Sequence, residues 1–128
     1  MPYIGRSKRI KTVRNKEKRI LSIAKLTLDK KADNLAVLDM RGLVNYTDYF
    51  VICSASSSRA AKTIADNIID FTSKSRIKAW HSEGYKEGEW ILLDLEGIIV
   101  HIFQAHKREF YGLERLWGDA PRVTLTEL

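Results

Sequence analysis

Two carboxylates in the second half of the chain have the spacing that comes closest to a catalytic site. Asp94 and Glu96 stand two residues apart, and residues with this spacing on a β-strand point to the same face. Such a pair could hold Mg²⁺ between its oxygens, as in nucleotidyltransferases. The segment 54–57, however, lacks the glycine that lets a backbone approach a phosphate closely. A binding protein is therefore favoured, and a divergent Mg-dependent nucleotidyltransferase using Asp94 and Glu96 is the alternative.

The other residues that could carry chemistry have no catalytic or metal-binding arrangement. His81, His101 and His106 show no metal-ligand spacing with one another or with Cys53. Cys53 is the lone cysteine and lies in an apolar run, which is typical of a small core residue. The serines at 56–58 are accounted for by helix capping. The sequence predicts no catalytic residue, no metal and no cofactor.

Apolar spacing predicts the elements that surround these residues. Helical periodicity marks three segments: 16–31, a helix that begins after the serines at 56–58, and a short helix with Phe110, Leu113, Leu116 and Trp117 on one face. Short apolar and β-branched runs predict five strands: 35–40, 49–54, 78–80, 90–94 and 98–103. The last two strands flank the turn 95–97 as a hairpin. This order predicts a single α/β domain with a mixed sheet of about five strands flanked by helices.

Charge divides the chain into an arm and a domain. Residues 1–19 carry eight basic side chains and one acidic one, whereas the remaining 109 residues carry 14 basic and 15 acidic ones. We expect a disordered basic arm over 1–15, a folded domain over 16–123 and a short tail over 124–128. The arm is either a solvated tail or a contact for nucleic-acid phosphates. Its basic residues are Arg6, Lys8, Arg9, Lys11 and Arg14.

Hydropathy predicts no membrane contact. The longest uninterrupted apolar run has five residues, 49–53, whereas a spanning helix needs about 20. The start of the chain also lacks the apolar stretch of a signal peptide. We therefore expect a soluble, cytoplasmic protein.

A series of motifs over roughly residues 20–123 resembles the Iojap family, the ribosomal silencing factors. The motifs are Leu38–Gly42, Thr47–Cys53, Ser57–Arg59, Ile64–Asp66, Glu83–Tyr85, Trp90–Asp94, Val100–Phe103, Arg108–Tyr111 and Leu113–Pro121. The chain departs from the family pattern at Ala55–Ser56, where Gly-Thr is usual, and at Glu96–Gly97, where Gly-Asp is usual.

The resemblance implies a function and a partner. Members bind protein L-fourteen of the large ribosomal subunit, block subunit joining and repress translation when nutrients are short. Their fold is similar to that of nucleotidyltransferases but has no known catalysis, and free members are often homodimers. The basic arm lies beyond the common family core, so contact with ribosomal RNA is a separate hypothesis.

The resemblance also indicates a partner-binding site. The family places a tryptophan at the position of Trp90 in the surface that engages the ribosomal protein, and tryptophan is enriched at binding hot spots. Asp94 and Glu83 are expected to pair with basic side chains of the partner. Lys107, Arg108 and Tyr111 are expected to border the same site.

Overall fold

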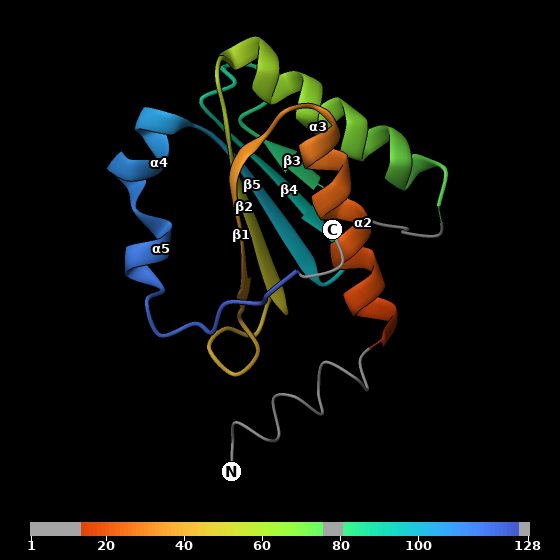
Figure 1. Cartoon of the computed structure of the whole chain (residues 1–128), viewed down its shortest axis with the longest axis vertical. Helices are drawn as coiled ribbons and strands as arrows, with labels where there is room; N and C mark the ends of the chain where they lie inside the picture. The colour runs from red at the N-terminus through yellow and green to blue at the C-terminus, as the bar shows by residue number, and fades with distance from the viewer. Residues whose placement is uncertain (1–13, 76–80, 126–128) are drawn as a thin grey trace.

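A five-stranded mixed sheet forms the centre of the molecule (Figure 1). The computed structural model describes residues 14–75 and 81–125. Its strands are β1 (Asp33–Asp39), β2 (Tyr49–Ala55), β3 (His81–Glu83), β4 (Trp90–Leu95) and β5 (Ile98–Gln104). Its helices are α2 (Arg14–Asp29), α3 (Ser58–Ser73), α4 (Ala105–Tyr111) and α5 (Leu113–Leu116). The predicted fold class, a single α/β domain with a mixed sheet, is confirmed.

The order of strands across the sheet is β1-β2-β5-β4-β3. β2 and β5 pair in parallel, and every other neighbouring pair is antiparallel. β4 and β5 form the predicted hairpin, in which Trp90 lies opposite Phe103 and Leu92 lies opposite His101. Since directly opposite residues share a face of the sheet, this register determines which side chains gather on each face.

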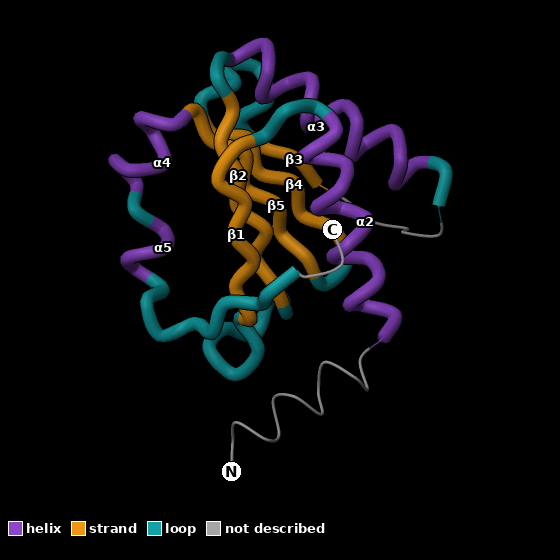
Figure 2. The backbone as a smooth tube through the Cα atoms, viewed as in Figure 1, coloured by secondary structure: helices purple, strands orange, loops and turns teal. Residues whose placement is uncertain are grey.

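One face of the sheet is covered by the two long helices (Figure 2). α3 begins where Ser57 Oγ accepts a hydrogen bond from the Ala60 amide, so the predicted serine cap is confirmed. Ile64 and Ile68 lie on its buried side, one turn apart, and pack against β2, β4 and β5. α2 contributes Ile20 to the same core. Each fully buried isoleucine stabilises the fold by about 2–3 kcal/mol of transfer free energy.

The other face is covered only in part, by the segment that follows β5. Leu113, Trp117 and Ala120 pack on the part of this face formed by β1, β2 and β5. The chain then returns to the edge strand β1, where the Val123 amide donates to the Val37 carbonyl at 2.9 Å. Trp90, at the start of β4, remains half-buried. This face is the one left open for contacts.

Two expectations about the elements change. The predicted final helix is two short helices, because Gly112 adopts a left-handed conformation with φ of +59° and breaks the run between α4 and α5. Phe110 and Leu116 consequently lie exposed instead of sharing one buried face. The predicted strand 78–80 lies outside the described residues, and the structure has its short strand at β3. α2 begins at Arg14, so the arm residues 1–13 also lie outside the described part.

Candidate partner-binding surface

Trp90 stands at the centre of the open face, held by three neighbours. Its ring stacks on Phe103 with 4.9 Å between centroids and lies 4.6 Å from the ring of Tyr111 on α4. Its indole N–H donates to Nδ1 of His101 at 3.1 Å. The side chain is therefore fixed in orientation while part of it stays accessible, which is the arrangement of a preorganised contact residue.

His101 is a buried, neutral base that positions Trp90. Burial lowers the pKa of its imidazole from 6.5 to about 4, so the ring is uncharged at neutral pH. Because Nδ1 accepts the indole hydrogen bond, the ring proton must sit on Nε2. Nε2 is buried and finds no hydrogen-bond partner within the described part of the chain. The nearest aromatic neighbour is Phe50, edge-on at 4.6 Å between centroids.

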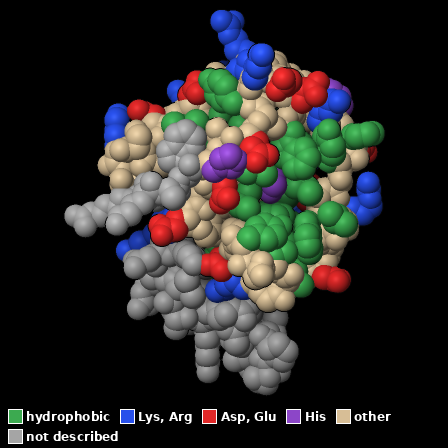
Figure 3. Space-filling view, turned by 180° about the vertical axis from the view of Figure 1, so that it is seen from behind, with side chains coloured by type: hydrophobic (Ala, Val, Ile, Leu, Met, Phe, Trp, Pro, Cys, Tyr) green, Lys and Arg blue, Asp and Glu red, His purple; other side chains and the backbone are tan. Residues whose placement is uncertain are grey.

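These contacts extend into what we term the aromatic row: Tyr46, Phe50, His101, Trp90, Tyr111 and Phe110. Consecutive rings in this order lie 6.5, 4.6, 5.9, 4.6 and 5.1 Å apart between centroids. The two ends of the row are the most accessible, since Tyr46 is 58% exposed and Phe110 is 74% exposed. Seen from behind, hydrophobic side chains gather on one half of the surface, beside acidic side chains and histidines (Figure 3). Exposed apolar side chains in contact with one another mark interaction sites more often than scattered ones do.

Acidic side chains lie beside the row on the same face of the sheet. Asp94 is two strand positions beyond Leu92 and four beyond Trp90, so all three point the same way. Glu83 pairs in register with Leu92, which places its carboxylate on this face as well. It forms an ion pair with His81 at 2.9 Å. The structure thus brings together the predicted residues Trp90, Tyr111, Asp94 and Glu83.

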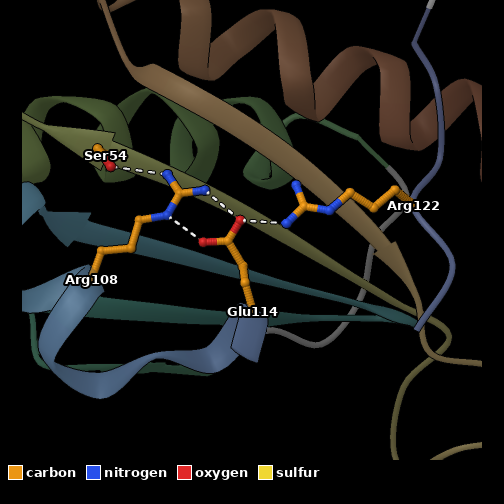
Figure 4. Close-up of polar contacts among 4 residues, drawn as sticks. All are labelled: Ser54, Arg108, Glu114 and Arg122. Carbon is orange, nitrogen blue, oxygen red and sulfur yellow. Dashed lines mark hydrogen bonds and ion pairs between the residues drawn. The ribbon is translucent and has the colours of Figure 1, made fainter. Parts of the chain in front are cut away.

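The two predicted basic residues have different surroundings. Lys107 Nζ lies 3.6 Å from Glu89 and 5.8 Å from the ring centroid of Phe110, at the margin of the aromatic row. Arg108 is only 11% exposed, and its guanidinium donates to both carboxylate oxygens of Glu114, at 2.8 and 3.0 Å, and to Ser54 Oγ at 2.9 Å (Figure 4). Arg108 therefore cross-links α4, α5 and β2 and does not face open surface.

The carboxylate pair predicted for catalysis does not have the expected geometry. β4 ends at Leu95, so Glu96 lies in the hairpin turn and does not share a strand with Asp94. Within residues 14–75 and 81–125, no three His, Cys, Asp or Glu side chains form a group that could hold a metal ion. The expectation that both carboxylates point to one strand face is wrong, because the strand is shorter than the apolar pattern suggested.

A comparison with protein-family models identifies the chain. The model described as "Ribosomal silencing factor during starvation" matches residues 13–128. The chain belongs to the ribosomal silencing factor family. The resemblance drawn from the motifs is thereby confirmed.

Known relatives and a solved structure agree with this assignment. The chain is 40% identical over 110 residues to the ribosomal silencing factor of Bacillus subtilis, covering 85% of this chain and 93% of the relative. It is 35% identical over 105 residues to the chloroplastic protein Iojap of Zea mays, covering 82% of this chain and 46% of that protein. A crystal structure from Bacillus halodurans superposes with a TM-score of 0.74 at 32% identity, covering 84% and 99% of the two chains. None of the described helices of this silencing factor is long and apolar enough to cross a membrane.

Several residues of the surface were missed from the sequence. Tyr46 and Phe110 end the aromatic row, but neither belongs to a periodic pattern that would mark it as exposed. His101 was expected to be a hydrogen-bonded strand histidine, and its bond to the Trp90 indole confirms that expectation. The identity of the partner could not be read from spacing, because it depends on the register of two strands.

Proposed function

We propose that this silencing factor binds the large ribosomal subunit through protein L-fourteen and thereby blocks joining of the small subunit. In this proposal it represses translation under nutrient limitation by steric blockade, without catalysis and without a cofactor. Family membership supports a ribosome-associated role. The aromatic row and its acidic margin supply the surface that such a role needs.

The observation that carries the proposal is the accessibility of rings that are already fixed in place. Phe110 is 74% exposed although its ring contacts Tyr111, which in turn contacts Trp90. Rigid aromatic side chains lose little conformational entropy on binding, and their apolar area is removed from water by a partner. Asp94 and Glu83 lie on the same face and favour a partner with basic side chains.

The six predicted residues have distinct parts in this proposal. Trp90 and Tyr111 act as apolar anchors, Asp94 and Glu83 pair with basic side chains, and Lys107 contacts the margin. Arg108 borders the same site and keeps α4 in place through its bonds to Glu114 and Ser54.

Sedimentation of the protein with purified large subunits tests the surface. Phe110→Ala should weaken binding on the order of tenfold or more, because the substitution removes an exposed ring from the proposed interface. Leu28→Ala is the matched control, since Leu28 is an exposed apolar residue of α2, on the opposite side of the sheet. Equal binding by the two variants would place the interface elsewhere.

A mixing experiment tests the blockade. Adding the protein to separated subunits should lower the yield of joined ribosomes in a sucrose gradient. Phe110→Ala should restore the yield. If the wild-type protein instead co-sediments with joined ribosomes at full occupancy, steric blockade is not the mechanism.

The free protein and its arm complete the proposal. A second copy covering the aromatic row would give a homodimer in the absence of ribosomes, and we place both forms in the cytoplasm. Sedimentation equilibrium of wild type and Phe110→Ala tests the dimer, which the variant should weaken. Contact of the basic arm with ribosomal RNA is a separate part of the proposal.

A further inference from the structure

A polar pocket lies beside the Arg108 cross-link, away from the aromatic row. Two adjoining hollows of about 410 and 400 Å³ share Asn34, Arg108, Glu114 and Arg122. The second hollow is also lined by Arg115. We term the two together the arginine pocket. No member of the aromatic row lines it.

The pocket contains more positive charge than its own carboxylates neutralise. Glu114 accepts from Arg108 through both oxygens and from Arg122 at 3.0 Å, and these two arginines keep the pKa of its carboxyl below the usual range. Three arginines therefore surround Glu114 and one further acid, Glu109, at the wall. The pocket keeps a net positive charge, and Glu114 has little capacity to accept more hydrogen bonds.

Two of the guanidinium groups retain donors. Arg122 uses one nitrogen, Nη2, in its bond to Glu114, and its side chain is 59% exposed. Arg115 is exposed and makes no side-chain hydrogen bond or ion pair with residues in the described ranges. Its guanidinium lies over Gly112, where an added Cβ would come within 2.6 Å of Nη2. The absence of a side chain at Gly112 thus leaves room for this group beside the pocket.

We propose that the arginine pocket binds the phosphate monoester group of a small ligand. A guanidinium presents a planar fork of donors that matches phosphate oxygens, and a dianion can accept from two such groups at once. Arg115 and Arg122 supply these donors, while Arg108 adds positive charge from a fixed position behind them. A volume near 400 Å³ is at the lower end for small-ligand sites. Among its lining residues no aromatic side chain is available to stack a nucleobase, which favours a small phosphate ester over a stretch of RNA.

Titration of the full-length protein with inorganic phosphate at low salt, followed by amide chemical shifts, tests the proposal. The amides of Asn34 and Gly112 should shift in a saturable manner. The double variant Arg115→Gln/Arg122→Gln should bind phosphate at least about tenfold more weakly, since each charge-assisted hydrogen bond contributes roughly 1.5–3 kcal/mol. Both side chains are exposed, so the variant should keep its fold, which the unchanged remainder of the spectrum verifies.

Arg59→Gln is the matched control, because Arg59 is an exposed arginine of α3 that does not line the pocket. It should bind phosphate like the wild type. The proposal is overturned if the wild type shows no saturable shift at millimolar phosphate, or if both variants lose equal affinity. It is also overturned if the double variant binds as tightly as the wild type, which would assign the binding to the basic arm. A short RNA that occupies the pocket when phosphate and a nucleoside monophosphate do not would make it a nucleic-acid site instead.

Discussion

Acidification should destabilise this protein through His101. The pKa of its imidazole is lowered by burial from 6.5 to about 4, so the folded state holds the ring neutral while the unfolded chain binds a proton near pH 6.5. A group whose pKa is depressed on folding contributes its full share of stability above the unfolded value. That share falls as pH drops from 6.5 towards 4 and is constant below. A difference of about 2.5 pKa units corresponds to about 3 kcal/mol.

Urea unfolding at a series of pH values between 7 and 4 measures this loss. Carboxylates with lowered pKa, Glu114 among them, also lose stabilisation in acid, so the wild-type curve contains more than one contribution. Comparison with His101→Phe isolates the histidine, because phenylalanine keeps an aromatic ring beside Phe50 and Phe103 but cannot titrate. The variant loses the acceptor for the Trp90 indole and should be less stable at pH 7.

The decisive quantity is therefore the slope of unfolding free energy against pH and not its value at one pH. His101→Phe should show a shallower slope between pH 6.5 and 4, smaller in total by about 3 kcal/mol. His106→Gln removes an exposed histidine of α4 and should keep the wild-type slope. Parallel slopes for wild type and His101→Phe would refute a buried neutral histidine under Trp90.

Four other perturbations test separate parts of the structure. Gly112→Ala should lower the unfolding free energy by about 1–2 kcal/mol, because φ of +59° is strained for alanine and the Arg115 guanidinium must move; Gly118→Ala, which meets only ordinary contacts, should be near neutral in the same urea titration. Glu114→Gln should cost about 2 kcal/mol in thermal or urea unfolding by leaving the Arg108 guanidinium without its carboxylate, whereas Glu109→Gln, exposed on α4, should cost little. Trp90→Ala should weaken binding to large subunits by about 2 kcal/mol or more; unchanged binding with a sharply lower melting temperature would make Trp90 a core residue only. Deletion of residues 1–13, which ends before α2, should flatten the salt dependence of subunit binding by a slope of about 0.7–0.9 per phosphate released; parallel slopes would make the arm a solvated tail.

Much of the fold could be predicted because its elements follow local patterns. The apolar run of β2 and the helical spacing of α3 each correspond to an element within two residues of its expected bounds. The alternation along β4 also placed Trp90 and Asp94 on one face correctly. These signals depend on neighbouring residues, so they can be read without knowledge of the tertiary structure.

The site could be predicted less completely, because it depends on long-range register and on single turns. The bond from Trp90 to His101 joins residues that are diagonal neighbours across the hairpin, since Trp90 lies opposite Phe103. Gly112 stands in an otherwise helical run, and an isolated glycine does not by itself end a helix. Glu96 was misplaced for a similar reason, since the apolar pattern does not show where β4 gives way to the turn.

The position of the open surface follows from how the two faces of the sheet are covered. α2 and α3 have 16 residues each and cover one face, whereas α4 has seven residues and α5 has four. The break at Gly112 and the bonds of Glu114 to Arg108 and Arg122 direct the chain after β5 towards β1, where its end pairs with that edge strand. The short helices therefore bury the β1 and β2 side of the second face and leave Trp90 on β4 partly accessible. A continuous helix from Ala105 to Leu116 would lack the turn at Gly112 that carries the chain from Tyr111 into α5. The turn and the ion pairs that shape the arginine pocket thus also determine which rings of the aromatic row a partner can reach.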